Sequence, residues 1–165
     1  MERILNLEER KMCLICERIE MIKQDKNKFF VEELETGYVV LGDTQHFKGY
    51  TLFLYKDHVH ELSELDQIEK IKFLAEMAAV GEAVANTFDC EKMNYELLGN
   101  GDPHLHWHLF PRVQGDLENY GHHGKGPVWW YPREKMYSPE NKVSDEELTQ
   151  MKINLRNEIK NILRM

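Results

Sequence analysis

The sequence predicts one domain of the α+β class, with a mostly antiparallel five-stranded sheet, a long helix and helices near both ends. Strand-like segments come in runs, three before the longest helical segment and two after it, and do not alternate with helices. A length of 165 residues fits a single hydrophobic core. We therefore expect one domain over residues 1–165, with a core at about 10–115 and a C-terminal extension at about 116–165.

The first helix and the first three strands follow from a change of hydrophobic period. In the first twenty-odd residues, apolar side chains recur at spacings of three and four, which is typical of an amphipathic helix. Segments 28–34, 36–43 and 49–55 are rich in aromatic and β-branched residues, which favours strands. Gly37, between the first two, is the residue that a tight hairpin connection favours. Short links between all three strands predict an antiparallel meander.

The longest helix is expected from Ser63 to about Phe88. Ser63 followed by Asp66 resembles a capping box, and an apolar stripe at helical spacing follows. Segments 92–100 and 104–112 then read as two further strands, separated by the turn-forming residues Asn-Gly-Asp-Pro.

The chain after residue 112 changes character. Glycines and prolines interrupt it, which predicts a long irregular segment. A last helix is expected to begin at Ser144, with Glu147 in the capping-box position. In the irregular segment, the aromatic run Trp129-Trp130-Tyr131 is expected to pack the loop onto the domain, with stacking on a nucleobase as the alternative.

Composition and charge exclude several classes of protein. The fractions of hydrophobic residues, 42%, and charged residues, 30%, are ordinary for a soluble globular protein. A net charge of -8 argues against a broad basic face for a nucleic acid polymer. The chain has neither a run of roughly 20 apolar residues for a membrane span nor the apolar core of a signal peptide at its start. We expect a cytoplasmic protein with its three cysteines reduced.

The stretch PHLHWHLFPR holds three of the eight histidines at alternate positions, His104, His106 and His108. On a strand, alternate side chains share one face, so the three imidazoles are expected to form a row while the apolar residues between them fill the core. Histidine titrates near pH 6.5, so a neutral ring can attack an electrophile such as phosphorus and a charged ring can donate a proton. The alternative is a half-exposed strand whose polar face happens to be imidazole.

The segment from His104 to Phe110 resembles the signature of the histidine triad (HIT) superfamily of nucleotide hydrolases and transferases. All seven positions match its pattern of histidines and apolar residues, and the Pro111-Arg112 that often trails the motif follows. The resemblance covers roughly residues 13–112, including GYTLFLYKDH after the second strand and NYELLGN before the triad.

This resemblance implies a compact HIT-like α+β domain that commonly dimerises through its sheet and acts on nucleoside phosphates. By this resemblance His106 is the nucleophile on the α-phosphorus. His108 contacts phosphate oxygens and the leaving group, and His104 orients His106 or binds a metal. Asp43 matches a position that accepts hydrogen bonds from the ribose hydroxyls, and Asn100 matches an asparagine near the phosphate. From sequence alone, an aspartate after a strand, such as Asp43, is more often a turn or cap residue, and Asn100 before a glycine also suits a turn.

Two departures from the family pattern concern the phosphate site. Many members carry a Gly-Gln-Ser/Thr loop before the triad, whereas only Gly-Asp-Pro separates Asn100 from His104 here. Tyr50 stands where a histidine is often found. Its phenol can hydrogen-bond a triad histidine but cannot carry a proton near neutral pH.

A zinc site is expected near the N-terminus. Cys13-x-x-Cys16 has a spacing that lets two thiolates share one ion, although two such cysteines are also compatible with a buried helix face. Some bacterial HIT proteins carry a structural zinc on such a pair, a histidine after the third strand and the first triad histidine. The resemblance therefore implies Cys13, Cys16, His58 and His104 as ligands, with His60 as the alternative to His58.

The leading functional hypothesis is a nucleotide hydrolase or nucleotidyl transferase acting on a dinucleoside polyphosphate or a nucleotide conjugate through a covalent nucleotidyl-histidine. The alternatives are a nucleotide-binding or signalling protein of low activity and a purely structural zinc protein. A homodimer is expected by family analogy.

Overall fold

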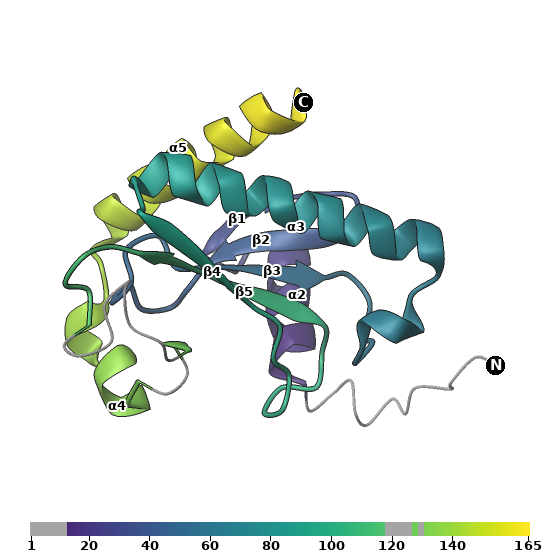
Figure 1. The fold of residues 1–165 in the computed structure, drawn as a ribbon, viewed down its shortest axis with the longest axis horizontal. Coiled ribbons are helices and arrows are strands. Elements are labelled where there is room, and N and C mark those ends of the chain that lie inside the picture. Colours follow the sequence, from purple (N-terminus) through teal and green to yellow (C-terminus); the bar gives the residue numbers. More distant parts are fainter. Residues whose placement is uncertain (1–12, 118–126, 129–130) are drawn as a thin grey trace.

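A computed structural model of the protein describes residues 13–117, 127–128 and 131–165. Its centre is a five-stranded sheet in which every neighbouring pair of strands is antiparallel, with the order β1-β2-β3-β5-β4 (Figure 1). The strands are β1 (Phe30–Glu33), β2 (Gly37–Leu41), β3 (Thr51–Tyr55), β4 (Lys92–Glu96) and β5 (His106–Arg112). The predicted α+β class, the meander of the first three strands and the five-stranded sheet are confirmed.

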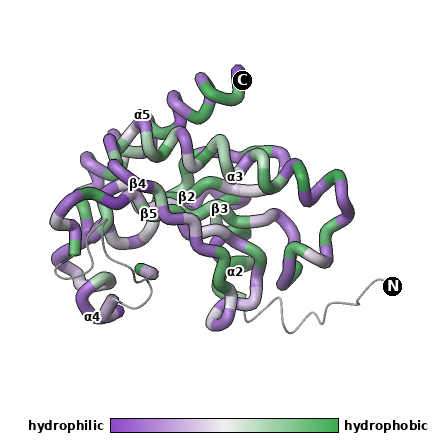
Figure 2. Tube along the Cα trace, viewed as in Figure 1, coloured by the Kyte–Doolittle hydropathy of each residue, from purple (hydrophilic) through white to green (hydrophobic). Residues whose placement is uncertain are grey.

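Helices cover both faces of the sheet (Figure 1). The α-helices of the described residues are α2 (Leu14–Lys23), α3 (Gln67–Phe88), α4 (Arg133–Met136) and α5 (Asp145–Leu163). The long helix α3 and the C-terminal helix α5 pack on one face, where Phe73 and Leu155 meet Phe53 and Leu109 of the strands. Helix α2 packs on the other face. Figure 2 shows that the apolar residues follow this layering, with hydrophobic colour along the central strands β2 and β3 and polar colour on turns of α5.

The packing of α2 leaves part of its sheet face open. Ile15, Ile19 and Ile22 lie against Tyr38, Val40 and Leu54 on β2 and β3. Side chains alternate along β5, so Leu109 joins the core under α3 while the neighbouring even-numbered residues face the α2 side. The side of the sheet that carries α2 is therefore also the side that carries the histidines of β5.

Gly37 has a different role from the predicted one. It is the first residue of β2, outside the turn, and it has no positive φ. A Cβ at this position would overlap the ring of Phe53 and approach the carbonyl oxygen of Leu54 to 2.5 Å. Glycine is needed here because β3 lies too close for a side chain, and the hairpin is closed by the Leu34 amide donating to the Gly37 carbonyl, 2.8 Å.

The start of α3 was predicted three residues too early. Ser63 lies in a 3₁₀ turn, Leu62–Glu64, which Glu61 and Glu64 close by reciprocal hydrogen bonds. Helix α3 itself begins at Gln67, because the Asp66 carboxylate accepts from the Glu69 amide and caps the first turn. The start of α5 is confirmed, since the Ser144 hydroxyl accepts from the Glu147 amide at 3.1 Å.

The described part of the C-terminal segment, residues 116–117, 127–128 and 131–165, contains more regular structure than predicted. It includes α4 and a 3₁₀ turn, Pro139–Asn141, before α5. Leu117, Val128 and Met136 of this segment are buried together with Phe47, Tyr50 and Phe110, and we call these six residues the C-terminal cluster. Tyr131 packs against it. The expectations for Trp129 and Trp130 fall outside the described residues.

A buried ion pair fixes the beginning of this segment to β5. The Arg112 guanidinium donates to both oxygens of Asp116, at 2.6 and 3.1 Å, and to the amide oxygen of Asn94, at 2.9 Å. The two charged side chains are only 3% and 4% exposed. None of the helices among the described residues is both long and apolar enough to cross a membrane.

Candidate functional site

The three histidines occupy two different environments. His106 and His108 lie on β5 and point to the α2 side, as the alternation of strand side chains predicts. His104 precedes the strand, in a turn where its amide donates to the Asp102 carbonyl at 2.7 Å. The predicted single row of three imidazoles is therefore wrong, because this turn directs His104 toward the cysteines of the α2 end.

A chain of hydrogen bonds fixes which nitrogen of each ring carries a proton. Nδ1 of His106 lies 2.5 Å from the His104 carbonyl oxygen, which can only accept, so Nδ1 is the protonated nitrogen. Nε2 of His106 therefore has a lone pair, and Nε2 of His108, 2.9 Å away, must donate to it. Nδ1 of His108 is then the acceptor, and the Tyr50 hydroxyl donates to it across 2.7 Å. Each ring is thereby held in one tautomer.

Burial keeps these groups neutral. Desolvation lowers the pKa of His108 to about 3, with a smaller contribution from His106 beside it. Desolvation also lowers the pKa of His106, against the opposing hydrogen bond to the His104 carbonyl and the charge of Asp102. The pKa of Tyr50 is raised well above its usual value, first by burial and then by contact with Tyr137. At neutral pH the site presents an unprotonated Nε2 on His106 and a protonated phenol on Tyr50.

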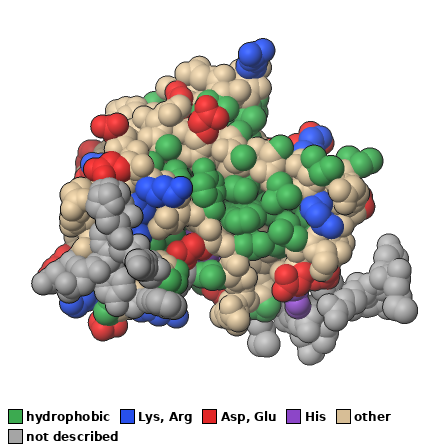
Figure 3. Space-filling model, in the orientation of Figure 1, with side chains coloured by type: hydrophobic (Ala, Val, Ile, Leu, Met, Phe, Trp, Pro, Cys, Tyr) green, Lys and Arg blue, Asp and Glu red, His purple; other side chains and the backbone are tan. Residues whose placement is uncertain are grey.

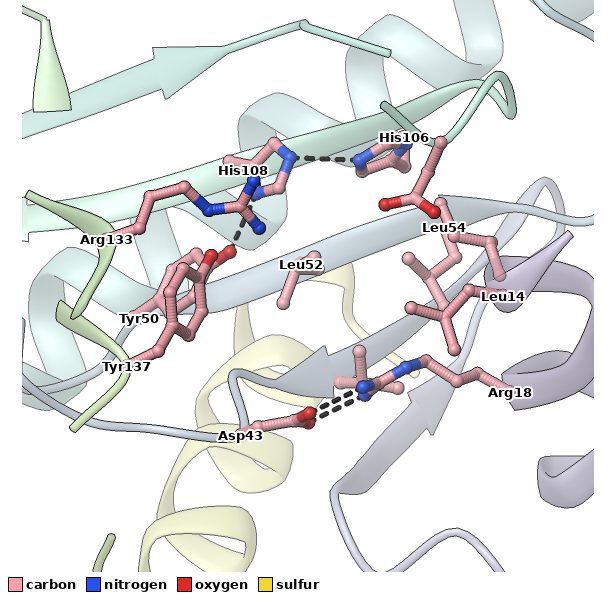
Figure 4. A pocket seen from close by; sticks show the side chains of 13 residues that line it. Leu14, Arg18, Asp43, Tyr50, Leu52, Leu54, His106, His108, Arg133 and Tyr137 are labelled. Carbon is pink, nitrogen blue, oxygen red and sulfur yellow. Dashed lines mark hydrogen bonds and ion pairs between the residues drawn. The ribbon is translucent and has the colours of Figure 1, made fainter. Parts of the chain in front are cut away.

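These side chains line a cavity of about 250 Å³ (Figure 4). His106 and His108 stand at one end of it, and Asp43 and Arg18 stand at the other. Its apolar wall is formed by residues of α2, β2 and β3: Leu14, Ile15, Val40, Leu52 and Leu54. An apolar cleft with a few convergent polar groups is the usual form of a small-molecule site.

Asp43 reaches this cavity, but its carboxylate already has a partner. Both oxygens accept from the Arg18 guanidinium, at 2.6 and 2.5 Å, in a bidentate pair. This hydrogen bond and the charge of Asp43 raise the pKa of Arg18. A carboxylate has about four acceptor positions, so two remain for a ligand. Sequence reasoning missed Arg18, because nothing in the helical pattern of α2 distinguishes it from other exposed charges.

Asn100 lines a second cavity, of about 290 Å³, which shares His106 and His108 with the first. The loop residues 98–102 form its wall. The residue with a positive φ in this loop is Gly99, at 111°, so the turn does not depend on the conformational freedom of Asn100. Asp102, His106, His108 and Arg133 line both cavities. Sequence reasoning also missed Arg133 and Tyr137, which α4 brings to the site from the segment predicted to be irregular.

The predicted metal ligands lie together. Cys13, Cys16, His58 and His104 each offer a ligand atom, and these atoms lie within 4.8 Å of one another. Nδ1 of His104 is 3.6 and 3.5 Å from the two sulfurs, and Nδ1 of His58 is 3.2 Å from Sγ of Cys16. Ligands about 2.3 Å (S) and 2.0 Å (N) from a tetrahedral zinc are about 3.5 Å apart, so the four residues fit this ion.

The second nitrogens of the two histidines support the same geometry. Nε2 of His104 donates to the Tyr55 carbonyl at 2.9 Å, which leaves Nδ1 unprotonated toward the sulfurs. Nε2 of His58 faces Nε2 of His60 at 3.3 Å. His58 thus contacts the cysteines directly, and His60 contacts His58 from behind. The alternative that places His60 among the four ligand atoms does not match this arrangement.

Comparison with known families agrees with the site. A family model described as the HIT domain matches residues 23–115, more than half of the chain. The chain belongs to the HIT family. Comparison with curated protein sequences found no match. The resemblance to the HIT family that the sequence motif indicated is therefore confirmed. The matched segment contains β1 to β5 and all three triad histidines.

Solved HIT structures share this fold. A histidine triad protein from Bradyrhizobium japonicum is 23% identical, with a TM-score of 0.66 over 79% of this chain and 89% of that chain. A HIT protein from Sinorhizobium meliloti is 18% identical, with a TM-score of 0.68 over 90% and 98%. A Zn-bound HIT family protein from Mycobacterium smegmatis is 19% identical, with a TM-score of 0.58 over 94% and 98%. At these identities the similarity shows the fold alone.

Proposed function

We propose that this HIT-family chain is a nucleotide hydrolase or nucleotidyl transferase that cleaves a phosphoanhydride or phosphoramidate bond through a covalent nucleotidyl-histidine at His106. The observation that carries the proposal is the fixed tautomer of His106. Its Nδ1–H donates to the His104 carbonyl, so Nε2 carries the lone pair. Nε2 faces His108, and both rings line the cavity. A neutral imidazole with one nitrogen anchored is prepared for attack on phosphorus.

The first step forms a bond between Nε2 of His106 and the α-phosphorus. The bond from phosphorus to the leaving oxygen or nitrogen breaks, and its electron pair departs with the leaving group. The positive charge that develops on the His106 ring is stabilised by the His104 carbonyl acting through Nδ1–H. When substrate is bound, the Nε2–H of His108 exchanges its hydrogen bond to His106 for one to the substrate. It then donates to a phosphate oxygen or to the leaving atom.

The second step returns the enzyme to its starting state. Water, or the hydroxyl of an acceptor, attacks phosphorus and displaces Nε2 of His106, and the proton of the attacking oxygen passes to the surrounding water. The bond order and charge of the ring are restored, with the proton still on Nδ1. Asp43, held by Arg18 at the opposite end of the cavity, would bind the ribose, and the apolar wall between the two ends would contact the nucleoside. Most of the rate enhancement in such phosphoryl chemistry comes from positioning and charge stabilisation.

Zinc on Cys13, Cys16, His58 and His104 is part of the proposal. Sulfur and nitrogen ligands in tetrahedral positions favour zinc over calcium or magnesium. Bound there, the ion would supply a structural cross-link between the start of α2, the loop after β3 and the turn before β5. The four protein ligands fill its coordination shell, so it has no position for substrate.

We also propose that the expected homodimer forms at β4, one of the two edge strands of the sheet. Tyr95 on β4 is 44% exposed and lies against Gly81 of α3, and Ile71 of α3 is 58% exposed. Figure 3 shows apolar side chains gathered on the face that α3 and β4 share. A Tyr95→Glu variant should sediment as a monomer where the wild type sediments as a dimer.

The catalytic proposal is tested by incubating the protein with diadenosine polyphosphates and with adenosine phosphoramidate. We expect the wild type to turn over these substrates and to yield a nucleotidyl adduct when the reaction is quenched without acid. His106→Ala should show neither turnover nor adduct. His46→Ala is the matched control, because its ring packs against Phe47 and Tyr131 and lines neither cavity. Equal turnover by wild type and His106→Ala contradicts the mechanism. Tight binding without turnover favours the low-activity nucleotide-binding protein, and metal without nucleotide affinity favours the structural zinc protein.

A further inference from the structure

Arg133 is a cation of the C-terminal segment that stands beside the triad histidines. It lines the cavity that runs from His108 to Asp43 and also the second cavity beside loop 98–102. In Figure 4 its side chain points from α4 toward His108. Arg18, the other arginine of the first cavity, holds Asp43 at the far end. The two arginines therefore serve opposite ends of one site.

The position of Arg133 is fixed by packing that its own helix supplies. Met136, three residues later, is 1% exposed and buried in the C-terminal cluster. Its carbonyl accepts from the Thr44 hydroxyl at 3.1 Å, which ties α4 to the loop after β2. Tyr137, four residues after Arg133 and on the same helix face, carries the guanidinium over its ring at 5.7 Å. Arg133 thus stands on a rigid platform and not on a free loop.

Charge balance gives this arginine a specific purpose. The loop Asn100-Gly101-Asp102-Pro103 beside the second cavity has one charged side chain, and that side chain is the Asp102 carboxylate. A second phosphate of a substrate, entering this cavity from an α-phosphate at His106, would meet a negative charge from the loop. The Arg133 guanidinium, which lines the same cavity, offsets that repulsion and offers a planar fork to phosphate oxygens.

We propose that Arg133 binds the second phosphate of the substrate, the one that departs when His106 attacks the α-phosphorus. This inference rests on the proposed function and concerns its phosphoanhydride substrates, in which a phosphate is the leaving group. When the Nε2–P bond forms, the bridging P–O bond breaks and the electron pair stays on the oxygen of the departing phosphate. Arg133 stabilises the negative charge that accumulates there, which an ammonia or amine leaving group does not develop in the same way.

Nucleotide affinities test this inference separately from the proposed function. Affinities for AMP and for α,β-methylene-ADP, which cannot be cleaved between its phosphates, are measured by calorimetry. We expect the wild type to bind the diphosphate more tightly than AMP. Arg133→Gln should reduce this ratio by about tenfold, the usual value of one charge-assisted hydrogen-bonding group. Its AMP affinity should stay unchanged, which also reports that α4 and the cavity remain folded.

The matched control is Lys135→Gln, which removes one positive charge from the same short helix at a residue that lines neither cavity. It should keep the wild-type ratio, and Arg133→Lys should keep part of it, because lysine retains the charge without the planar fork. AMP binding with an unchanged ratio in Arg133→Gln overturns the inference alone, as does an equal loss for AMP and the diphosphate. Absence of AMP binding by the wild type overturns the proposed function and the inference with it.

Turnover gives a second readout. Arg133→Gln should lower kcat/KM for diadenosine tetraphosphate by about tenfold or more and leave kcat/KM for adenosine phosphoramidate unchanged. The same fold-change on both substrates assigns Arg133 to the α-phosphate or to the fold, and contradicts a role at the second phosphate.

Discussion

The Tyr50 hydroxyl donates to Nδ1 of His108 across 2.7 Å, and this contact determines the proton position on the ring beside the nucleophile. Packing holds Tyr50 in place independently of the hydrogen bond. Its ring stacks on Phe110 with centroids 4.3 Å apart, and Gly42 leaves room that a Cβ would fill. A tyrosine at this position can fix a tautomer, because its pKa stays well above neutrality, but it does not relay a proton.

Tyr50→Phe should therefore lower kcat with little change in KM. The variant keeps the ring and its stacking but releases Nδ1 of His108, so a fraction of the rings takes the tautomer that has no proton on Nε2. We expect a loss of roughly ten- to a hundredfold in kcat, less than the full 10²–10⁴ of a general acid. Steady-state kinetics measure the loss, and an unchanged melting temperature shows that packing is intact. An unaltered kcat contradicts the tautomer argument.

Asp43→Asn should weaken binding of ribonucleotides specifically. The carboxylate has two acceptor positions left after its bidentate pair with Arg18, and these are the positions proposed for the ribose hydroxyls. Hydrogen bonds to a charged group contribute about 1.5–3 kcal/mol, so the affinity for AMP should fall by tenfold or more. Affinity for 2′,3′-dideoxy-AMP provides the control and should not change. A parallel loss for both nucleotides would instead assign Asp43 to the fold.

Acid should destabilise the protein through His108. Burial lowers the pKa of His108 to about 3 in the folded chain, against about 6.5 in the unfolded chain. The unfolded chain therefore binds the proton first. The contribution of a neutral His108 is complete above pH 6.5 and is lost as the pH falls toward 3, by about 1.4 kcal/mol per pH unit. Denaturant unfolding from pH 7 to pH 4.5 should give a shallower pH dependence for His108→Gln. Parallel curves for the two proteins contradict the assignment.

The features that were predicted correctly from the sequence are those that residues close together in the chain determine. Alternation along 104–112 predicted which side chains of β5 face the core, and Ser144 with Glu147 predicted the start of α5. The four predicted metal ligands also lie together, but that expectation came from family resemblance and not from spacing alone. Ser63 failed as a helix start because Asp66, the other residue of the same pattern, makes the capping bond.

The features that sequence missed depend on contacts between distant segments. Arg133 reaches the histidines because Met136 is buried against Phe47 and Phe110, and no local pattern in 113–143 reports that packing. Arg18 meets Asp43 because α2 packs against β2 and Asp43 follows that strand. His104 leaves the strand because it satisfies the Tyr55 carbonyl and faces two cysteines 88 and 91 residues away in sequence. Periodicity gives the face of a side chain but not its partner on another element.

Removing zinc should affect both stability and catalysis. The proposed ion holds His104, and the carbonyl of His104 anchors Nδ1 of His106. Chelation, or Cys16→Ser, should lower the free energy of unfolding by about 3 kcal/mol or more, which corresponds to roughly 6–12 °C in Tm for a domain of this size. It should also lower kcat, since a displaced His104 carbonyl no longer fixes the His106 tautomer, while KM changes less.

Cys90→Ser is the matched control for this prediction, because Cys90 is a cysteine outside the four-residue cluster. It should keep bound metal, Tm and kcat. Metal content is measured by elemental analysis of the purified protein, and kcat is measured before and after chelation and after zinc is restored. If chelation lowers the stability and leaves kcat unchanged, the ion holds α2 on the sheet and does not position His106. If zinc restores both the stability and kcat and magnesium does not, the sulfur and nitrogen ligands control the position of the nucleophile His106.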